Sequence, residues 1–440
     1  MHRLSNSITT RQKLLGNMFW LYALQGLNYL APLAVLPYLI RVLGVERYGL
    51  VAFAQAFAQY FTILTDYGFN LSATKRISLV REHRSEVSAL YWSVILIKLA
   101  LMLIGALVVA VVVMTVPRFH SDAALYAIAY LAVVGNVLFP VWLFQGMEQM
   151  RYISIVSGCA KIFAALLLFV FVHVQSDYLI ALAIQSGGLL IAGVAGFWIG
   201  VTRFHLSFRL PTGAELRRTL ADGWHLFVSN AAGTLYATTN VFLVGLVAGN
   251  LQAGYFSAAE RLTRSIQGML GPITQAIYPH VSGLAARSRD HAVAFIRKSL
   301  VWISGLSFAP SVILLIFAHP IALILFGKAT SGSVEPLRWM AMLPFIISVS
   351  SVLAIQTMIP FGMEKALSRI YVVAGFSSLA LSIPMIHRYG ATGGAASVLI
   401  VEGCIVLAMW HVLKRHAIDL WPRSTAALQK GKVSEDAFSC

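Results

Sequence analysis

The sequence predicts an all-α polytopic membrane protein with about twelve transmembrane helices, and three observations support this fold class. Apolar stretches joined by short loops occupy nearly all of the 440 residues. Hydrophobic residues make up 58% of the chain and charged residues only 11%, whereas a soluble domain is usually about 25% charged. Mean hydropathy is +0.77. This composition leaves almost no room for a soluble domain.

The individual spans are apolar stretches long enough to cross a hydrocarbon core of about 30 Å, which takes about 20 helical residues. In chain order we expect helices at residues 17–40, 48–74, 88–114, 122–146, 153–174, 178–201, 224–247, 252–280, 296–325, 338–361, 367–386 and 391–413. Several exceed the required length, so we expect tilt or kinks. The polar, basic start runs straight into the first span, which we expect to be an uncleaved anchor.

The placement of basic residues predicts the orientation. If the N-terminus is cytoplasmic, the cytoplasmic segments hold 23 Lys and Arg residues and the opposite segments hold 6. Such a bias sets topology, with both termini inside. The net charge of +16 is therefore mainly an orientation signal and gives no reason to expect nucleic acid, although some of these residues could contact anionic lipid headgroups.

Two halves of the chain show signs of an internal repeat. Gly146-Met147-Glu148 recurs as Gly362-Met363-Glu364 at an offset of 216, and Leu43-Gly44 with Gly49 matches Ala248-Gly249 with Gly254 at an offset of 205. Six spans separate the equivalents, so the halves share one orientation, as suits a transporter with a cavity between two bundles. We expect a six-helix bundle at 1–205, a cytoplasmic linker at 206–222, a second six-helix bundle at 223–415 and a cytoplasmic tail at 416–440.

Polar side chains inside four spans point to a central cavity. They are Gln25 and Asn28 in the first span, Gln55, Gln59, Thr62 and Asp66 in the second, Asn230, Thr234 and Thr238 in the seventh, and Glu260, Arg261, Arg264, Gln267 and Thr274 in the eighth. The set in the second span follows i, i+4, i+7 and i+11, which is one face of a helix. Lipid cannot satisfy these groups, so they should face inward. Hydrogen bonds that only hold helices together are the alternative.

Arg261 and Arg264 are the most informative of these residues. They lie about 9 and 12 residues into their span, where an unpartnered arginine costs at least a few kcal/mol. Glu260 is expected to pair with Arg264 at i,i+4, which leaves Arg261 for an external anion. Arginine suits bidentate contacts with phosphate.

Lys98, Lys161, Asp66 and Glu402 are the other charged candidates inside spans. Each lysine could line an inner vestibule, extend to the interface or pair with a carboxylate. Asp66, Glu260 and Glu402 are candidates for ion or proton coupling, and pairing of Asp66 with Lys75 or Arg76 is the alternative.

The sequence contains no pattern that indicates an enzyme, a metal site or a cofactor. It has no HExxH, GxSxG or Walker motif, and its 12 histidines are scattered. Its 3 cysteines form no CxxC or Cys/His metal spacing.

Several motifs resemble a known family. Pro37-Tyr38, Arg41, Leu43-Gly44, Tyr48-Gly49, Asp66-Tyr67-Gly68-Phe69-Asn70 and the segment 139–148 (FPVWLFQGME) are similar to those of Wzx-type polysaccharide repeat-unit flippases, which serve O-antigen or exopolysaccharide synthesis. These belong to the multidrug/oligosaccharidyl-lipid/polysaccharide exporter superfamily. Looser matches at Tyr278-Pro279 and Phe326-Gly327 extend the resemblance over residues 12–413.

The resemblance implies a bacterial inner-membrane protein with two six-helix bundles around a cavity that opens alternately to each side. Its substrate would be an undecaprenyl-diphosphate-linked oligosaccharide, moved from the cytoplasmic to the periplasmic leaflet. Arg261 or Arg264 would then hold the diphosphate, Lys98 and Lys161 would line the substrate cavity, and Gln25, Asn28, Gln55, Gln59 and Asn230 would accommodate the sugars. A polysaccharide polymerase and a chain-length regulator are the expected protein partners.

Two other functions stay open. A cation-coupled multidrug antiporter of the same superfamily is the first alternative, although its cavity should be acidic or aromatic, whereas basic groups here equal or exceed acidic ones. A membrane glycan polymerase or ligase is the second, although such an enzyme needs a sizeable external loop and the longest here has about 10–12 residues, which is a short connection.

Overall fold

The computed structural model of the chain describes residues 2–269, 271–327, 332–416, 418 and 420, and the side chains at 2–25, 27–31, 225, 229–230, 232–237, 271–272, 275–276 and 279 lie outside this description. The described residues form helices joined by short connections, and no β-strand occurs among them. The predicted all-α class is therefore confirmed.

The first half of the chain forms helices close to the predicted spans. They are α1 (His2–Asp66), α2 (Phe69–Val80), α3 (Arg84–Thr115), α4 (Pro117–His120), α5 (Ala123–Leu138), α6 (Val141–Gly146), α7 (Met150–Phe171) and α8 (Tyr178–Arg203), with a 3₁₀ turn, η1 (Gln175–Asp177), before α8. The second predicted span ends early, at Asp66, because Tyr67 and Gly68 adopt positive φ angles of 41° and 71°.

The second half follows the same plan with more interruptions. Its helices are α9 (Gly213–Ala248), α10 (Asn250–Gly268), α11 (Gly271–Arg287), α12 (Arg289–Ile316), α13 (Ala318–Phe326), α14 (Val334–Ala341), α15 (Leu343–Ser351), the π-helical η3 (Val352–Met358) and α16 (Glu364–Arg415). Seven described helical segments are long and apolar enough to cross a membrane. The chain is thus a multi-pass membrane protein, and the number of twelve spans stays a prediction.

Two glycines that the repeat pairs with each other break the chain in the same way. Gly44 interrupts α1 at φ 75° and ψ 159°, and Gly249 separates α9 from α10 at φ 89° and ψ 176°. Side chains with a Cβ rarely adopt such angles, which glycine reaches without steric penalty. The 205-residue offset therefore relates positions with equivalent backbone geometry. The predicted boundaries of the two bundles themselves stay a prediction.

Helix α9 begins eleven residues before the predicted span, at Gly213. Thr212 and Glu215 form a reciprocal capping box, in which the Thr212 hydroxyl accepts from the Glu215 backbone N–H at 3.3 Å and the Thr212 N–H donates to the Glu215 carboxylate at 2.7 Å. Such a cap starts a helix regardless of hydropathy. A search for apolar stretches therefore missed the first eleven residues of α9. These hydrogen bonds also hold the pKa of Glu215 below its ordinary value.

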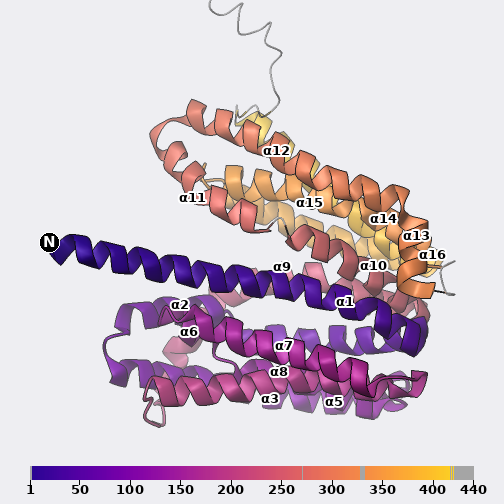
Figure 1. Cartoon of the computed structure of the whole chain (residues 1–440), viewed down its shortest axis with the longest axis horizontal. Helices are drawn as coiled ribbons and strands as arrows, with labels where there is room; N and C mark the ends of the chain where they lie inside the picture. Colours follow the sequence, from indigo (N-terminus) through magenta and orange to yellow (C-terminus); the bar gives the residue numbers. More distant parts are fainter. Residues whose placement is uncertain (1, 270, 328–331, 417, 419, 421–440) are drawn as a thin grey trace, which may run out of the picture.

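The helices form two groups in Figure 1. Helices α2–α8 make up the lower group and α10–α16 the upper group, with α1 and α9 between them. Toward the end where α1 approaches α10, the groups pack closely, and toward the N-terminus α11 and α12 diverge from α1. We call the end where α1 approaches α10 the closed end.

At the closed end the repeat-related glycines Gly49 and Gly254 bring α1 and α10 into backbone contact. A Cβ on Gly49 would lie 1.9 Å from the Asn250 carbonyl oxygen, and one on Gly254 would lie 2.2 Å from the Val45 carbonyl oxygen. No side chain larger than hydrogen fits there. Close approach at small residues is a common way for helices to associate in membranes.

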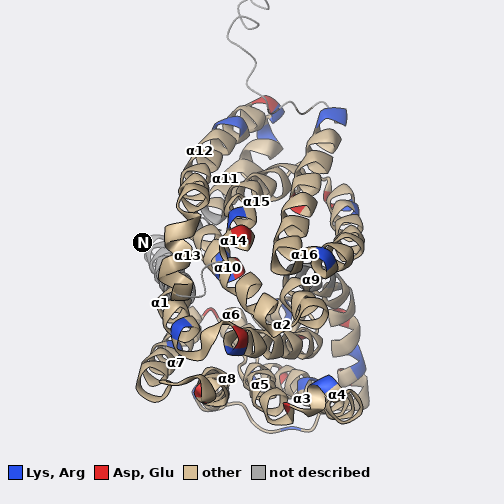
Figure 2. Cartoon of the chain, turned by 90° about the vertical axis from the view of Figure 1, so that its right-hand side faces the viewer, with Lys and Arg blue, Asp and Glu red and all other residues tan. Residues whose placement is uncertain are grey.

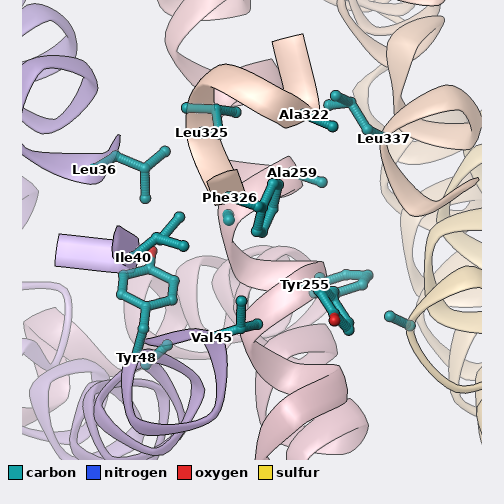
Figure 3. Packing of buried hydrophobic residues seen from close by; sticks show 14 of the residues in the cluster. Leu36, Ile40, Val45, Tyr48, Tyr255, Ala259, Ala322, Leu325, Phe326 and Leu337 are labelled. Carbon is teal, nitrogen blue, oxygen red and sulfur yellow. The ribbon is translucent and has the colours of Figure 1, made fainter. Parts of the chain in front are cut away.

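Arginines and apolar packing reinforce the same contact. Arg118 of α4 donates to the Leu246 carbonyl at 2.6 Å and to the Gly245 carbonyl, and Arg41 of α1 donates to the Ile324 carbonyl. Guanidinium groups stabilise the exposed carbonyls at helix C-termini. Figure 3 shows the apolar residues beside them, which come from α1, α10, α13 and α14: Leu36, Ile40, Val45, Tyr48, Tyr255, Ala259, Ala322, Leu325, Phe326 and Leu337.

Candidate functional site

The polar stripe of α1 lines two adjoining cavities between α1 and the first group of helices. Gln55, Gln59 and Thr62 line a cavity of about 370 Å³, and Gln59, Thr62 and Asp66 line a second of about 410 Å³. Helices α5, α7 and α8 complete both, and the two share Lys161 and Gln185. We call them together the N-terminal cavity. The prediction that this face of the second span points inward is confirmed.

Asp66 is held inside this region by a buried network. The Lys98 ammonium lies 3.3 Å from Asp66 Oδ1 and donates to the Asn136 carbonyl at 3.2 Å, while Asn136 Nδ2 donates to the same Asp66 oxygen at 2.9 Å. Lys98 is only 1% exposed. A buried charge at this depth needs such a partner.

This network decides between alternatives that the sequence left open. Lys98 pairs with a carboxylate and lines neither part of the N-terminal cavity, so it is not placed to contact substrate there. Asp66 pairs with Lys98, and Arg76 pairs instead with Asp222 at 3.2 Å. The alternative pairing of Asp66 with Lys75 or Arg76 is therefore wrong. The aspartate itself still borders the cavity.

Arg261 of α10 reaches across to α1. Its Nη2 donates to Gln55 Oε1 at 2.6 Å, its guanidinium carbon lies 5.7 Å from the centre of the Tyr48 ring, and it lines the N-terminal cavity. The arginine is thus held by an amide and an aromatic ring, both neutral. Its positive charge is available to an anion that enters the cavity.

Arg264 faces a different place. Its Nε and Nη2 donate to Glu260 Oε1 at 3.1 Å and 2.7 Å, which confirms the expected i,i+4 pair. Glu260, Arg264, Gln267, Asn240 and Glu402 line a separate cavity of about 150 Å³ among α9, α10, α14, α15 and α16. We call it the C-terminal cavity.

Gln55, Gln59, Thr62 and Asp66 of α1 thus line one cavity together with Arg261 of α10, whereas Glu260, Arg264 and Gln267 of α10 line another. One shared cavity was expected for all four stripes. The side chains of Gln25, Asn28, Asn230 and Thr234 lie outside the described residues, so their predicted roles stay predictions.

Sequence reasoning missed Asn136, Ser157 and Gln185, which line the N-terminal cavity from α5, α7 and α8. Each is a polar residue inside an otherwise apolar span. An amide within a span was the available signal for Asn136 and Gln185, but without a second polar residue on the same face it did not stand out.

Charged residues are sparse throughout the molecule, as Figure 2 shows. The apolar helices and the polar cavities within them define a multi-pass membrane transporter. The family model described as "Polysaccharide biosynthesis protein" matches residues 14–285. The chain belongs to this family, and the resemblance noted in the sequence is confirmed.

Two curated relatives carry the name "Putative O-antigen transporter". The one from Escherichia coli (strain K12) is 35% identical over 93% of this chain and 98% of its own length. The one from Shigella dysenteriae is 32% identical over 90% of this chain and 99% of its own length. Both relatives are named as transporters, and a transporter rather than an enzyme is the class that they and the family indicate for this chain.

Solved structures share the fold at low identity. A lipid II flippase MurJ in an inward closed conformation superposes with a TM-score of 0.72 at 14% identity, over 91% of this chain and 87% of that one. An inward-facing multidrug resistance MATE family transporter gives a TM-score of 0.63 at 12% identity, over 89% and 98% of the two chains. At these identities the likeness concerns the fold alone.

Proposed function

We propose that this protein moves lipid-linked oligosaccharide repeat units, carried on undecaprenyl diphosphate, from the cytoplasmic to the periplasmic leaflet for surface polysaccharide synthesis. The observation that carries the proposal is the N-terminal cavity with Arg261 at its border. Amides and hydroxyls suit sugars, a guanidinium suits a diphosphate, and a prenyl chain can stay in lipid. The family and the O-antigen transporter relatives support the same substrate class.

Transport would proceed by alternating access. The Gly49–Gly254 contact and the arginines at helix ends join the two groups of helices at the closed end. Rocking of the two groups would break the α1–α10 contact, separate this end and bring the opposite end together. Lipid-linked substrate bound beside Arg261 would thereby become accessible from the other leaflet.

The orientation follows from the loop charges. Lys and Arg are in excess on the loops that lie on the same side of the membrane as the N-terminus. This excess supports cytoplasmic termini in the bacterial inner membrane. The closed end would then face the periplasm. A polysaccharide polymerase and a chain-length regulator would be the protein partners that use the delivered repeat units.

Energy coupling has three candidates, Asp66, Glu260 and Glu402. Asp66 borders the N-terminal cavity, and the two glutamates line the C-terminal cavity. Proton or ion binding at either place would alter the charge of a membrane-embedded group, which is a large energetic change.

One observation favours a cation-coupled multidrug antiporter as the second candidate. The C-terminal cavity holds the two carboxylates Glu260 and Glu402 with a single arginine, Arg264, and such a site suits a cation better than a diphosphate. The N-terminal cavity, with Lys161 and Arg261 on its wall, favours the flippase.

A deletion in the source bacterium tests these two functions against each other. The flippase predicts loss of surface polysaccharide and accumulation of lipid-linked repeat units, both restored by the wild-type gene and not by Arg261→Ala at equal protein level. Normal polysaccharide with altered resistance to cationic dyes would instead establish the antiporter.

A further inference from the structure

The N-terminal cavity extends well beyond Arg261. Along α1 its wall runs from Gln55 to Asp66, eleven residues apart, or about 16 Å of helix at 1.5 Å per residue. A diphosphate at Arg261 would occupy one end only. The rest of the cavity is therefore available to another part of the substrate, and it lies between α1 and helices α5, α7 and α8 of the first group.

The wall of this remaining part combines hydrogen-bonding and apolar groups. Gln59, Ser157 and Lys161 contribute an amide, a hydroxyl and an ammonium, and Ala132 and Ala164 contribute apolar surface. Sugars present hydroxyl groups that both donate and accept, together with apolar C–H faces. A primary amide, which also both donates and accepts, matches such hydroxyls.

Gln59 provides the most specific indication of a ligand. Within the described part of the chain no protein group accepts from or donates to its amide, although it is half buried and lines both parts of the cavity. Gln55, one turn earlier, bonds both Gln185 at 3.2 Å and Arg261. The Gln59 amide therefore borders the cavity with both its donor and its acceptor available to a ligand.

The charge distribution argues against the diphosphate as the occupant of this part. Its wall holds Lys161 and Asp66, whose charge Lys98 neutralises, and no arginine. A diphosphate therefore finds its bidentate guanidinium partner only at the border with Arg261. The C-terminal cavity is no alternative for the sugars, because it measures only about 150 Å³.

We propose that the N-terminal cavity between Gln59 and Asp66 is the glycan subsite, which binds the sugars next to the diphosphate, with Gln59 and Lys161 as specificity-determining residues. The inference rests on the proposed flippase function and deepens it. It makes the two halves of the chain unequal: Gln59 of α1 and Lys161 of α7, both in the first half, select the repeat unit, and α10 in the second half contributes the anion contact through Arg261.

Thiol protection tests the subsite directly. In a protein whose native cysteines are replaced, Ser157→Cys introduces a thiol into the cavity wall. The control is a second protein in which native Cys159 is the cysteine that is kept and Ser157 is unchanged. Cys159 lies two residues from position 157 on α7 and is exposed on the molecular surface. The probe is the lipid-free oligosaccharide released by mild acid from the source strain's own lipid-linked repeat unit.

We expect the oligosaccharide to slow alkylation at position 157 about tenfold when its concentration is ten times its Kd, and to leave Cys159 unaffected. Undecaprenyl diphosphate without sugar should protect less. Equal alkylation with and without oligosaccharide, or equal protection at both positions, would overturn the proposal.

Two further variants keep the test independent of the introduced thiol. Gln59→Leu should weaken oligosaccharide binding about tenfold, as expected for one lost hydrogen bond of about 1.4 kcal/mol. Ala164→Phe should fill the cavity and abolish binding, whereas Ile162→Phe, on the exposed face of α7, should not. Unchanged binding in both cavity variants would contradict the subsite.

Transport of the intact lipid-linked repeat unit separates this inference from the function on which it rests. If wild-type protein transports that substrate but the oligosaccharide gives no protection, the subsite is wrong and the flippase stands. If wild-type protein moves no lipid-linked sugar, the proposed function itself fails.

Discussion

Arg261 Nη2 lies 2.6 Å from Gln55 Oε1, and this hydrogen bond links α10 to α1 at the border of the N-terminal cavity. With the repeat offset of 205, Gln55 is the equivalent of Glu260, the neighbour of Arg261. The polar stripes of α1 and α10 thus contact each other at nearly equivalent positions of the two halves. A ligand anion that replaces the amide of Gln55 would exchange a neutral partner for a charged one, which is the stronger interaction.

Arg261→Ala should abolish transport with little effect on membrane insertion, because the arginine contacts an amide and a ring rather than a buried charge. Arg261→Lys should retain only part of the activity, since an ammonium lacks the bidentate geometry of a guanidinium. Surface polysaccharide measured at matched protein levels checks both. Wild-type polysaccharide in Arg261→Ala would remove the arginine from the mechanism.

Replacing one charge of the Asp66–Lys98 pair should destabilise the protein more than replacing both charges. Asp66→Asn alone leaves Lys98 buried without its counter-charge and should lower the free energy of unfolding by about 2–3 kcal/mol, below the value for a fully buried pair because Asp66 is 30% exposed. Lys98→Met combined with Asp66→Asn should recover much of the loss. Thermal unfolding in detergent compares the wild-type protein, Asp66→Asn, Lys98→Met and the double variant. If the loss in the double variant equals the sum of the two single losses, the two charges do not interact.

Gly49→Ala and Gly254→Ala should prevent the close contact of α1 with α10, because each Cβ would overlap a backbone oxygen. We expect both variants to shift the protein away from this conformation, measured as a longer distance between spin labels across the closed end, and to reduce transport. Gly187→Ala and Gly403→Ala are matched controls, since nothing lies within 4 Å of a Cβ at either site. An unchanged distance in Gly49→Ala would show that the contact is not tight in the membrane.

The capping box of α9 should make stability depend on pH in the acid range. The pKa of Glu215 is lowered mainly by the Thr212 backbone N–H and also by the Thr212 hydroxyl. Its contribution to stability is therefore complete above the ordinary carboxyl pKa and is lost as the pH falls through the lowered one. Glu215→Gln should lose this dependence, which thermal midpoints of the two proteins between neutral and acidic pH would detect. Parallel curves would show that the cap does not couple to unfolding.

Hydropathy and loop charge were sufficient to predict the helical fold, and helical periodicity predicted the inward face of α1. Gly44 and Gly249 explain why the repeat can be detected in the sequence. Few residues other than glycine adopt their backbone angles, so both halves have glycine at this position. The short interruptions at Tyr67–Gly68 and the early start of α9 were missed, because hydropathy windows detect neither turns nor caps.

The site was predicted less completely than the fold, for physical reasons. The i,i+4 spacing predicted the Glu260–Arg264 pair because both residues lie on one helix. Pairing of Lys98 with Asp66 joins α3 to α1, and Gln185 bonds Gln55 from α8. Such contacts depend on how helices pack, which periodicity along a single helix does not encode.

Leaflet translocation tests the central claim most directly. Purified protein in proteoliposomes would be given a labelled undecaprenyl-diphosphate oligosaccharide, and a membrane-impermeant sugar-modifying reagent would report the leaflet that holds the label. We expect protein-dependent movement that is lost in Arg261→Ala and retained in Ile162→Phe. Absence of movement in the wild-type protein, with and without imposed ion gradients, would contradict the flippase function.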